Sequence, residues 1–159
     1  MAVKKLDDLE SLYQIEKTLG KGSFGEVVQA VHLKSKEARA IKIIKKSRIQ
    51  EKKSLIVLMM QEIGVLMQND HPNLMKVHEI VEDDLNYYII SELLTGGELY
   101  YKIVQMKVFT EQDAAHIIKQ ILLGLNYMHS KNVMHRDIKP ENILIEKDLE
   151  VKITDFGFA

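Results

Sequence analysis

Acidic, basic and amide side chains are concentrated in one short stretch of the chain, His135 to Asn142. Asp137 can accept a proton from a hydroxyl group, and Lys139 can neutralise an anion. Asn142 and the later Asp155 offer hard oxygen ligands suited to Mg²⁺. These groups fit the transfer of a phosphoryl group, in which catalysis is mostly positioning and neutralisation of charge. The stretch alone also fits a polar turn between a helix and a hairpin, so the rest of the chain must decide.

The surroundings of this stretch predict a loop held between apolar elements. Pro140 has no backbone N–H group to donate, which disfavours a helix or a central strand at this point. Apolar residues dominate 121–128 before the loop and 143–145 after it. We therefore expect buried elements on both sides to hold the loop in place.

A glycine-rich turn lies near the N-terminus. Its nine residues, which form a G-x-G-x-x-G-x-V pattern, are Leu19, Gly20, Lys21, Gly22, Ser23, Phe24, Gly25, Glu26 and Val27. Glycines allow backbone N–H groups to approach phosphate oxygens closely. A dinucleotide-binding turn uses the same glycines but opens a helix. Here the β-branched run 27–31 follows, so the pattern favours a strand–turn–strand arrangement.

A lysine lies among apolar residues in the next predicted strand, 38–44. Lys42 could simply extend its charged end into water from an edge strand. A functional role needs a partner for a half-buried charge. Glu62, in a helix predicted over about 54–68, is the candidate.

Periodicity predicts the other elements. Strands are expected at 13–16, 74–81, 87–92, 143–145 and 151–154, and helices at 98–105 and 110–129. Thr110 to Asp113 resembles a capping box for the last helix. The apolar stripe predicted for that helix consists of Ala114, Ile118, Ile121, Leu125 and Met128. A break at 95–97 predicts a hinge, which gives a polar segment 1–12, a first lobe 13–94 and a second lobe 95–159.

Composition sets outer limits on the class of protein. The 159 residues are 46% hydrophobic and 28% charged, with a net charge of -1, which is ordinary for one globular domain. This balance gives no reason to expect nucleic acid or a membrane as a partner. There is no cysteine, so disulfides and thiolate metal sites are excluded. No signal peptide or transmembrane stretch is evident, and we expect a cytoplasmic protein.

Taken in order, these motifs resemble those of eukaryotic protein kinases. The matching features are the glycine-rich turn, Ala40-Ile41-Lys42, Glu62, His135-Arg136-Asp137, Asn142 and Asp155-Phe156-Gly157. The resemblance covers nearly all of the chain from Tyr13 onward. It implies an α+β, protein-kinase-like fold with a β-rich small lobe that contains one major helix, followed by the first part of a helical large lobe.

The resemblance also implies a role for each matching residue, with ATP and Mg²⁺ as cofactors. Lys42, paired with Glu62, would hold the α- and β-phosphates beneath the glycine-rich turn. Asp155 and Asn142 would bind Mg²⁺, and Asp137 would accept or orient the substrate hydroxyl beside Lys139. The residues implied around the nucleotide are Val27, Ala40 and Leu144 against adenine, Glu92 and Leu94 through their backbones, Glu98 near the ribose, and Ser91 at the entrance to the space behind adenine.

Finer similarity points to serine/threonine kinases of the calcium/calmodulin-dependent or calcium-dependent group. Lys139, two residues after Asp137, is typical of serine/threonine kinases. Glu98 and Glu141 match positions that recognise basic residues near the phosphorylated site, although Glu98 could serve only the ribose and Glu141 only packing. The chain contains no calcium-binding EF-hand loop, so control by a calcium sensor is expected only if the full-length protein carries one.

The chain ends two residues after the Asp155-Phe156-Gly157 motif, whereas a complete kinase continues through an activation segment and further helices. Three readings of function therefore stay open: a phosphotransferase represented by part of its domain, a catalytically inactive nucleotide-binding or interaction fragment, and a fragment without function. We expect residues 1–159 alone not to be a competent kinase. Because the motif residues are intact, the sequence favours the first of these functions, a phosphotransferase.

Overall fold

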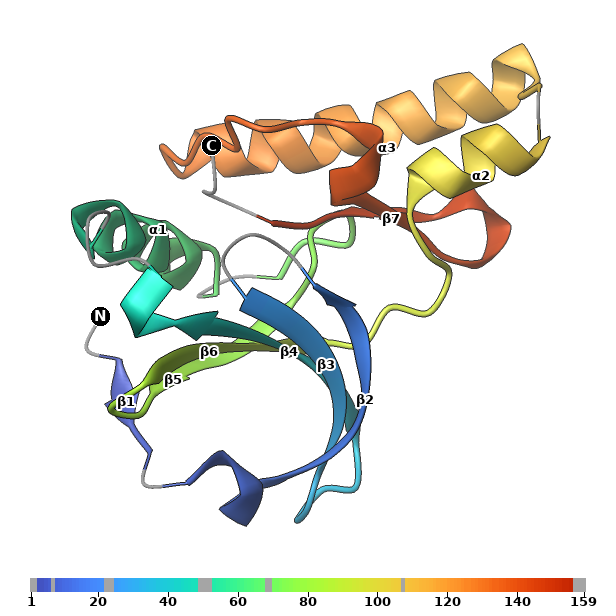
Figure 1. Ribbon diagram of the computed structural model, residues 1–159. Helices are drawn as coiled ribbons and strands as arrows, with labels where there is room; N and C mark the ends of the chain where they lie inside the picture. The colour runs from blue at the N-terminus through green and yellow to red at the C-terminus, as the bar shows by residue number, and fades with distance from the viewer. Residues whose placement is uncertain are drawn as a thin grey trace. The chain divides into compact units, whose positions relative to one another are not determined.

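The computed structural model of the chain describes residues 3–6, 8–21, 25–48, 53–67, 70–106 and 108–155 (Figure 1). It divides into two compact units. We call residues 1–61 and 77–93 the sheet unit, and residues 62–76 and 94–159 the helical unit. Strands and helices are largely segregated, so the fold is of the α+β class, as predicted.

One six-stranded sheet forms the sheet unit. Its strands are β1 (Lys4–Lys5), β2 (Tyr13–Lys21), β3 (Gly25–His32), β4 (Ala38–Lys45), β5 (Val77–Glu82) and β6 (Asn86–Glu92). Their order across the sheet is β1-β5-β6-β4-β3-β2, and only β1 pairs in parallel with its neighbour. The predicted strands are present here, and β2 continues through Gly20 into the glycine-rich turn.

An apolar core covers one face of this sheet. Val28, Ile41 and Ile90 lie side by side in register on β3, β4 and β6, and each is buried. With Tyr13 and Leu9, from the short 3₁₀ helix Leu9–Ser11, they belong to one apolar core. Side chains alternate between faces along a strand, so the residues next to Ile41 in sequence point to the opposite face.

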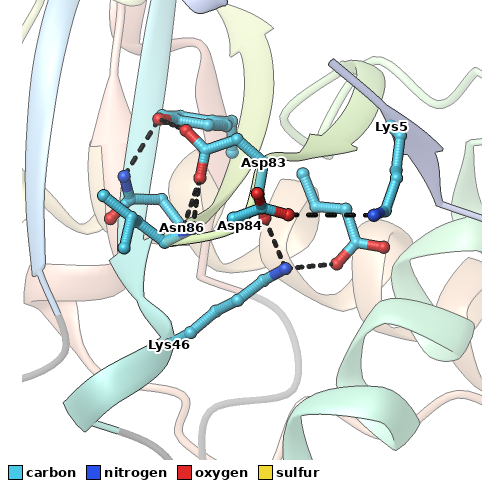
Figure 2. A network of polar contacts seen from close by, with 8 residues as sticks. Lys5, Lys46, Asp83, Asp84 and Asn86 are labelled. Atoms are coloured by element: carbon cyan, nitrogen blue, oxygen red, sulfur yellow. Dashed lines mark hydrogen bonds and ion pairs between the residues drawn. The ribbon is translucent and has the colours of Figure 1, made fainter. Parts of the chain in front are cut away.

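Polar contacts fix the hairpin between β5 and β6 (Figure 2). The Asp83 carboxylate accepts hydrogen bonds from the backbone of Asn86 at 2.6 Å and from the Tyr88 hydroxyl at 2.5 Å. Burial and the bond to Asp83 raise the pKa of Tyr88 to about 12. Lys46 bonds the carboxylate of Glu82 at 2.7 Å. β5 and β6 pair antiparallel, from Val77 opposite Ser91 to Glu82 opposite Tyr87, and side chains as well as the strands hold the turn between them.

The helical unit combines helices with a small hairpin. Its elements are α2 (Leu99–Met106), α3 (Glu111–Ser130), β7 (Ile143–Ile145), β8 (Val151–Ile153) and the 3₁₀ helices Pro140–Asn142 and Lys147–Leu149. The helix α1 (Lys53–Leu66) begins in the sheet unit and ends in the helical unit. None of the helices in the described parts of the chain is long and apolar enough to cross a membrane.

The start of α3 is as predicted, but its buried face is not. Thr110 and Asp113 form the expected capping box, with the Asp113 backbone donating to the Thr110 hydroxyl at 3.1 Å. Ile118, predicted on the buried stripe, is 54% exposed, whereas Ile117 is buried. The buried residues of α3 are Ile117, Ile121, Gly124 and Met128. The predicted stripe is therefore wrong at Ala114 and Ile118, both of which are exposed.

A glycine explains why the buried face could not be found from apolar residues. Gly124 packs so closely that a Cβ atom there would lie 2.9 Å from Ile153 Cδ1 and 3.2 Å from Leu74 Cδ2. Beside it, Gln120 accepts bonds from Asn73 at 3.0 Å and from the Val151 backbone at 3.1 Å. Gly124 and Gln120 thus hold α3 against the β7–β8 hairpin. Neither has an apolar side chain that a hydrophobic pattern would include.

Candidate active site

The predicted catalytic loop follows α3 and is anchored by a buried histidine. His135 is 2% exposed, and its Nε2 atom lies 2.7 Å from the carbonyl oxygen of Thr154. The backbone N–H of Asp137 donates to His135 Nδ1 at 3.3 Å. Because Nδ1 accepts, Nε2 must carry the ring proton and donate it to Thr154. The imidazole therefore joins the loop to the residue that follows β8.

Lys139 and Asn142 converge on the carboxylate of Asp137. Lys139 Nζ lies 2.8 Å from Asp137 Oδ2, and Asn142 Nδ2 lies 2.9 Å from the same oxygen. The hydrogen bonds from Lys139 and Asn142 lower the pKa of Asp137 below the ordinary aspartate value. The bond to Asp137 raises the pKa of Lys139. Asp137 is thus ionised at neutral pH, and its orientation is set by two donors.

Asn142 is itself held from several sides. It is buried, and its Nδ2 group also donates to the Asp137 carbonyl at 2.8 Å. Its own carbonyl accepts from the Thr154 backbone at 2.9 Å and from the Thr154 hydroxyl at 3.2 Å. Asp155 comes directly after Thr154 and has a left-handed backbone, with φ of 59°. This pairing therefore brings the two predicted Mg²⁺ ligands to the same end of the β7–β8 hairpin.

Two further carboxylates of the helical unit act on Glu98. Burial raises the pKa of Glu98, and the charges of Glu141 and Asp155 raise it further. Glu98 lies at the start of α2 and forms an isolated β-bridge with Leu144 of β7. Glu98, predicted near the ribose, and Leu144, predicted against adenine, are thus neighbours. The carboxylates that act on Glu98 make this region negatively charged.

Arg136 makes an ion pair with Glu62 that sequence spacing did not predict. Arg136 Nη2 lies 2.6 Å from Glu62 Oε2, and both residues belong to the helical unit. Arg136 itself has a left-handed backbone, with φ of 67°. The pairing of Glu62 with Lys42, which lies in the sheet unit, stays a prediction.

Three predicted nucleotide residues share one face of the sheet unit. Val27 on β3 is in register with Lys42 on β4, and Ala40 precedes Lys42 by two residues. Directly opposed and i, i+2 residues point to the same side of a sheet. This is the face opposite the apolar core around Ile41. Ser91 lies across from Ala40 on β6, and its hydroxyl is 3.3 Å from the Ala40 carbonyl.

The ends of the glycine-rich turn are described, but its tip is not. Gly20 pairs with Val27 across β2 and β3. At Gly25 a Cβ atom would lie 1.7 Å from the carbonyl oxygen of Ile43, so only glycine fits between β3 and β4 there. The predicted residues outside the described parts of the chain are Gly22, Ser23, Phe24, Phe156 and Gly157.

The remaining predicted nucleotide residues fall in two places, around the end of β6 and at the end of β2. Glu92 ends β6 opposite Arg39, and Leu94 follows two residues later in a half-buried position. Lys21 ends β2 opposite Glu26, and Leu19 lies just before Gly20 and is exposed. None of the contacts of these residues in the described structure tests their predicted roles.

Sequence reasoning missed Thr154 as a member of this site. Its backbone and hydroxyl both bond Asn142, and its carbonyl accepts from His135. The available signal was its position directly before Asp155, but threonine is also common at the end of a strand. Its role becomes visible only when β8 is placed beside the catalytic loop.

Comparison with known proteins assigns the class. A model of the protein kinase domain matches residues 13–159. Calcium-dependent protein kinase 5 of Plasmodium berghei is 48% identical over 157 aligned residues, a match that covers 96% of this chain and 27% of that protein. Calcium-dependent protein kinase 4 of Plasmodium falciparum is 47% identical over 151 residues, 92% of this chain and 28% of that protein. Human calcium/calmodulin-dependent protein kinase type 1B is 37% identical over 159 residues, 98% of this chain and 46% of that protein.

The chain belongs to the protein kinase domain family. Within that family its relatives are serine/threonine kinases of the calcium-dependent and calcium/calmodulin-dependent group, which confirms the resemblance drawn from the motifs. The sheet and the helices of the chain have the α+β arrangement expected of an incomplete protein-kinase-like fold. The chain spans about a quarter of the length of the first two relatives described.

Proposed function

We propose that the protein is an ATP-dependent serine/threonine kinase that transfers the γ-phosphoryl group of ATP to a hydroxyl group of a protein substrate. The observation that carries this proposal is the triad in which Lys139 and Asn142 both bond the carboxylate of Asp137. An ionised carboxylate, a cation and an amide at one point are the groups that phosphoryl transfer needs.

The residues present fit a magnesium ion. No group of three or more histidine, cysteine, aspartate or glutamate side chains in the described ranges could hold a metal. Magnesium, however, is commonly held by one or two protein oxygens together with phosphates and water. Asn142 uses its NH₂ group for Asp137, so its amide oxygen takes part in neither of those bonds. That oxygen and the carboxylate of Asp155 form a donor set of the required kind.

Each residue then has a defined task. ATP supplies the phosphoryl group, and the bound cation neutralises its charge. Asp137 accepts the proton of the substrate hydroxyl or orients that hydroxyl; its lowered pKa keeps it ionised at neutral pH. Lys139 holds Asp137 in place and offers positive charge to the phosphoryl oxygens. We assign Lys42 to the α- and β-phosphates, with Val27 and Ala40 beside it on the same face of the sheet.

We further propose that the substrate carries basic residues near the phosphorylated hydroxyl. Support comes from the raised pKa of Glu98, caused by burial and by the carboxylates of Glu141 and Asp155. A lysine or arginine side chain brought to this cluster would relieve the repulsion between its members. Control by a calcium sensor in the native protein is a proposal by analogy with the names of the relatives. Cytoplasmic location stays a prediction from the sequence.

The second candidate function is a nucleotide-binding or interaction module without catalysis. One assay distinguishes the two: transfer of labelled phosphate from Mg-ATP to a basic serine peptide by the native protein. Asp137→Asn should lower kcat by about 10²–10⁴-fold, the usual contribution of a positioned proton acceptor. The matched control is Asp148→Asn, an exposed aspartate in the turn between β7 and β8. Equal activity of the two variants would contradict the kinase assignment at this site, and ATP binding without transfer would favour the module.

A further inference from the structure

Glu146, directly after β7, binds a second segment of the chain. Its Oε1 atom accepts hydrogen bonds from the backbone N–H of Thr95 at 2.7 Å and of Gly96 at 3.1 Å. Bonds from backbone N–H groups to a carboxylate are charge-assisted and stronger than those between neutral groups. One side chain thus satisfies two consecutive donors of the segment that precedes α2.

The backbones of the two segments are also in close contact. Ile145 donates to the carbonyl of Gly97 at 2.8 Å, and Glu98 forms a β-bridge with Leu144. A Cβ atom on Gly96 would lie 1.6 Å from the Ile145 carbonyl oxygen, so a larger residue could not follow this path. Gly97 has φ of 85°, which also favours glycine. Residues 95–98 therefore run along 144–146 like a short antiparallel pair.

The backbones of the two segments bond each other at Gly97, and the Glu146 carboxylate bonds the two residues that precede Gly97. Thr95 and Gly96 have their N–H groups directed at the side chain, where a regular ladder would offer a carbonyl. The Glu146 backbone is itself fixed, since its N–H donates to the Glu150 carbonyl at 2.7 Å. The β7–β8 turn therefore fixes the backbone that carries the acceptor.

We infer that Glu146 is a positioning residue for nucleotide and substrate binding, and this inference rests on the kinase function proposed above. Its carboxylate holds Thr95 and Gly96 against the end of β7. It thereby sets the place of Glu98 relative to Leu144, the two residues assigned to ribose and adenine. Glu146 touches none of the reacting groups; Asp137 and Lys139 lie on a different segment with bonds of their own.

The expected kinetic effect is on KM and not on kcat. In the native protein, Glu146→Ala should raise KM for ATP by about three- to tenfold, which corresponds to the net contribution of one ordinary hydrogen bond. Its kcat should stay within about twofold of the parent value. Glu146→Gln keeps an acceptor oxygen at the same distance and should restore much of the affinity. The control Glu150→Ala removes the same charge from the same turn and should leave KM unchanged.

Amide hydrogen exchange tests the inference without relying on catalysis. Exchange at Thr95 and Gly96 should accelerate in Glu146→Ala but not in Glu150→Ala, while the amides of β8 keep their protection. If exchange accelerates but no variant or parent transfers phosphate, the contact is real and the proposed function has failed. Unchanged exchange at Thr95 and Gly96 would overturn the inference. Faster exchange throughout β7 and β8 would also overturn it, since Glu146 would then be a general stabiliser.

Discussion

The two units of the molecule hold the residues proposed for function by different physical means. In the sheet unit, strand register places Val27, Ala40 and Lys42 on one face, and an apolar core on the other face fixes the strands. In the helical unit, Asp137 is oriented by hydrogen bonds from Lys139 and Asn142. An apolar core tolerates substitutions that keep the volume of the side chain. A hydrogen-bond network is disrupted when one of its partners is removed. The residues proposed for function in the two units should therefore be sensitive to different substitutions.

The largest expected effect on stability lies in the core of the sheet unit. Ile41 is completely buried between Val28 and Ile90. Ile41→Ala should lower the free energy of unfolding by about 2–5 kcal/mol, and Ile41→Val by about 0.5–1.5 kcal/mol, because methyl groups are removed and a cavity is left. Denaturant unfolding of the native protein measures both. A loss below about 1 kcal/mol for Ile41→Ala would show that this core does not stabilise the sheet.

A smaller effect is expected where the helical unit is packed most closely. Gly124→Ala should lower the free energy of unfolding by about 1–3 kcal/mol through overpacking, since the new Cβ would lie 2.9 Å from Ile153 Cδ1. Ile153→Val removes that Cδ1 atom, so the double variant should lose less than the sum of the two single losses. Asn126→Ala, at an exposed position of the same helix, is the control. Strict additivity in the cycle would contradict the proposed contact.

The smallest expected effect is a pH dependence. It should distinguish binding of a basic peptide, measured by KM, from catalysis, measured by kcat. The pKa of Glu98 is raised, so this carboxylate takes up a proton before an ordinary glutamate does as the pH falls. The pKa of Asp137 is lowered, so Asp137 stays ionised over the same range. As the pH falls toward the range in which an ordinary glutamate titrates, KM for a basic peptide should therefore rise severalfold before kcat changes. In Glu98→Gln this dependence of KM should disappear; a kcat that falls in parallel with affinity would contradict the assignment of the two groups.

Local signals predicted much of the fold because they depend on neighbouring residues. The capping box at Thr110 and the hairpin formed by 143–145 and 151–153 follow from short patterns and are present. The buried face of α3 was mispredicted because Gly124 occupies a core position without contributing apolar character. A packing requirement of this kind depends on Ile153 and Leu74, which are distant in sequence.

The candidate site shows the same limit. The types of residue at Asp137, Lys139 and Asn142 could be interpreted from sequence, since their chemistry is intrinsic. The contact of Arg136 with Glu62 joins residues 74 positions apart, and no spacing rule indicates it. Glu146 and Thr154 likewise act through backbone groups of other segments. Such roles depend on which segments are brought side by side, which the sequence shows only after the fold is known.

The most direct test of this account compares kcat for Asn142→Ala and Ile41→Val in the native protein at a temperature where both are folded. Asn142→Ala removes two bonds to Asp137 and one proposed Mg²⁺ ligand, so we predict a fall in kcat of about a hundredfold or more. Ile41→Val weakens only the core, so its kcat should equal that of the parent protein. A kcat for Asn142→Ala within tenfold of the parent value, or an equal fall for Ile41→Val, would contradict the claim that a polar network in the helical unit positions the catalytic carboxylate.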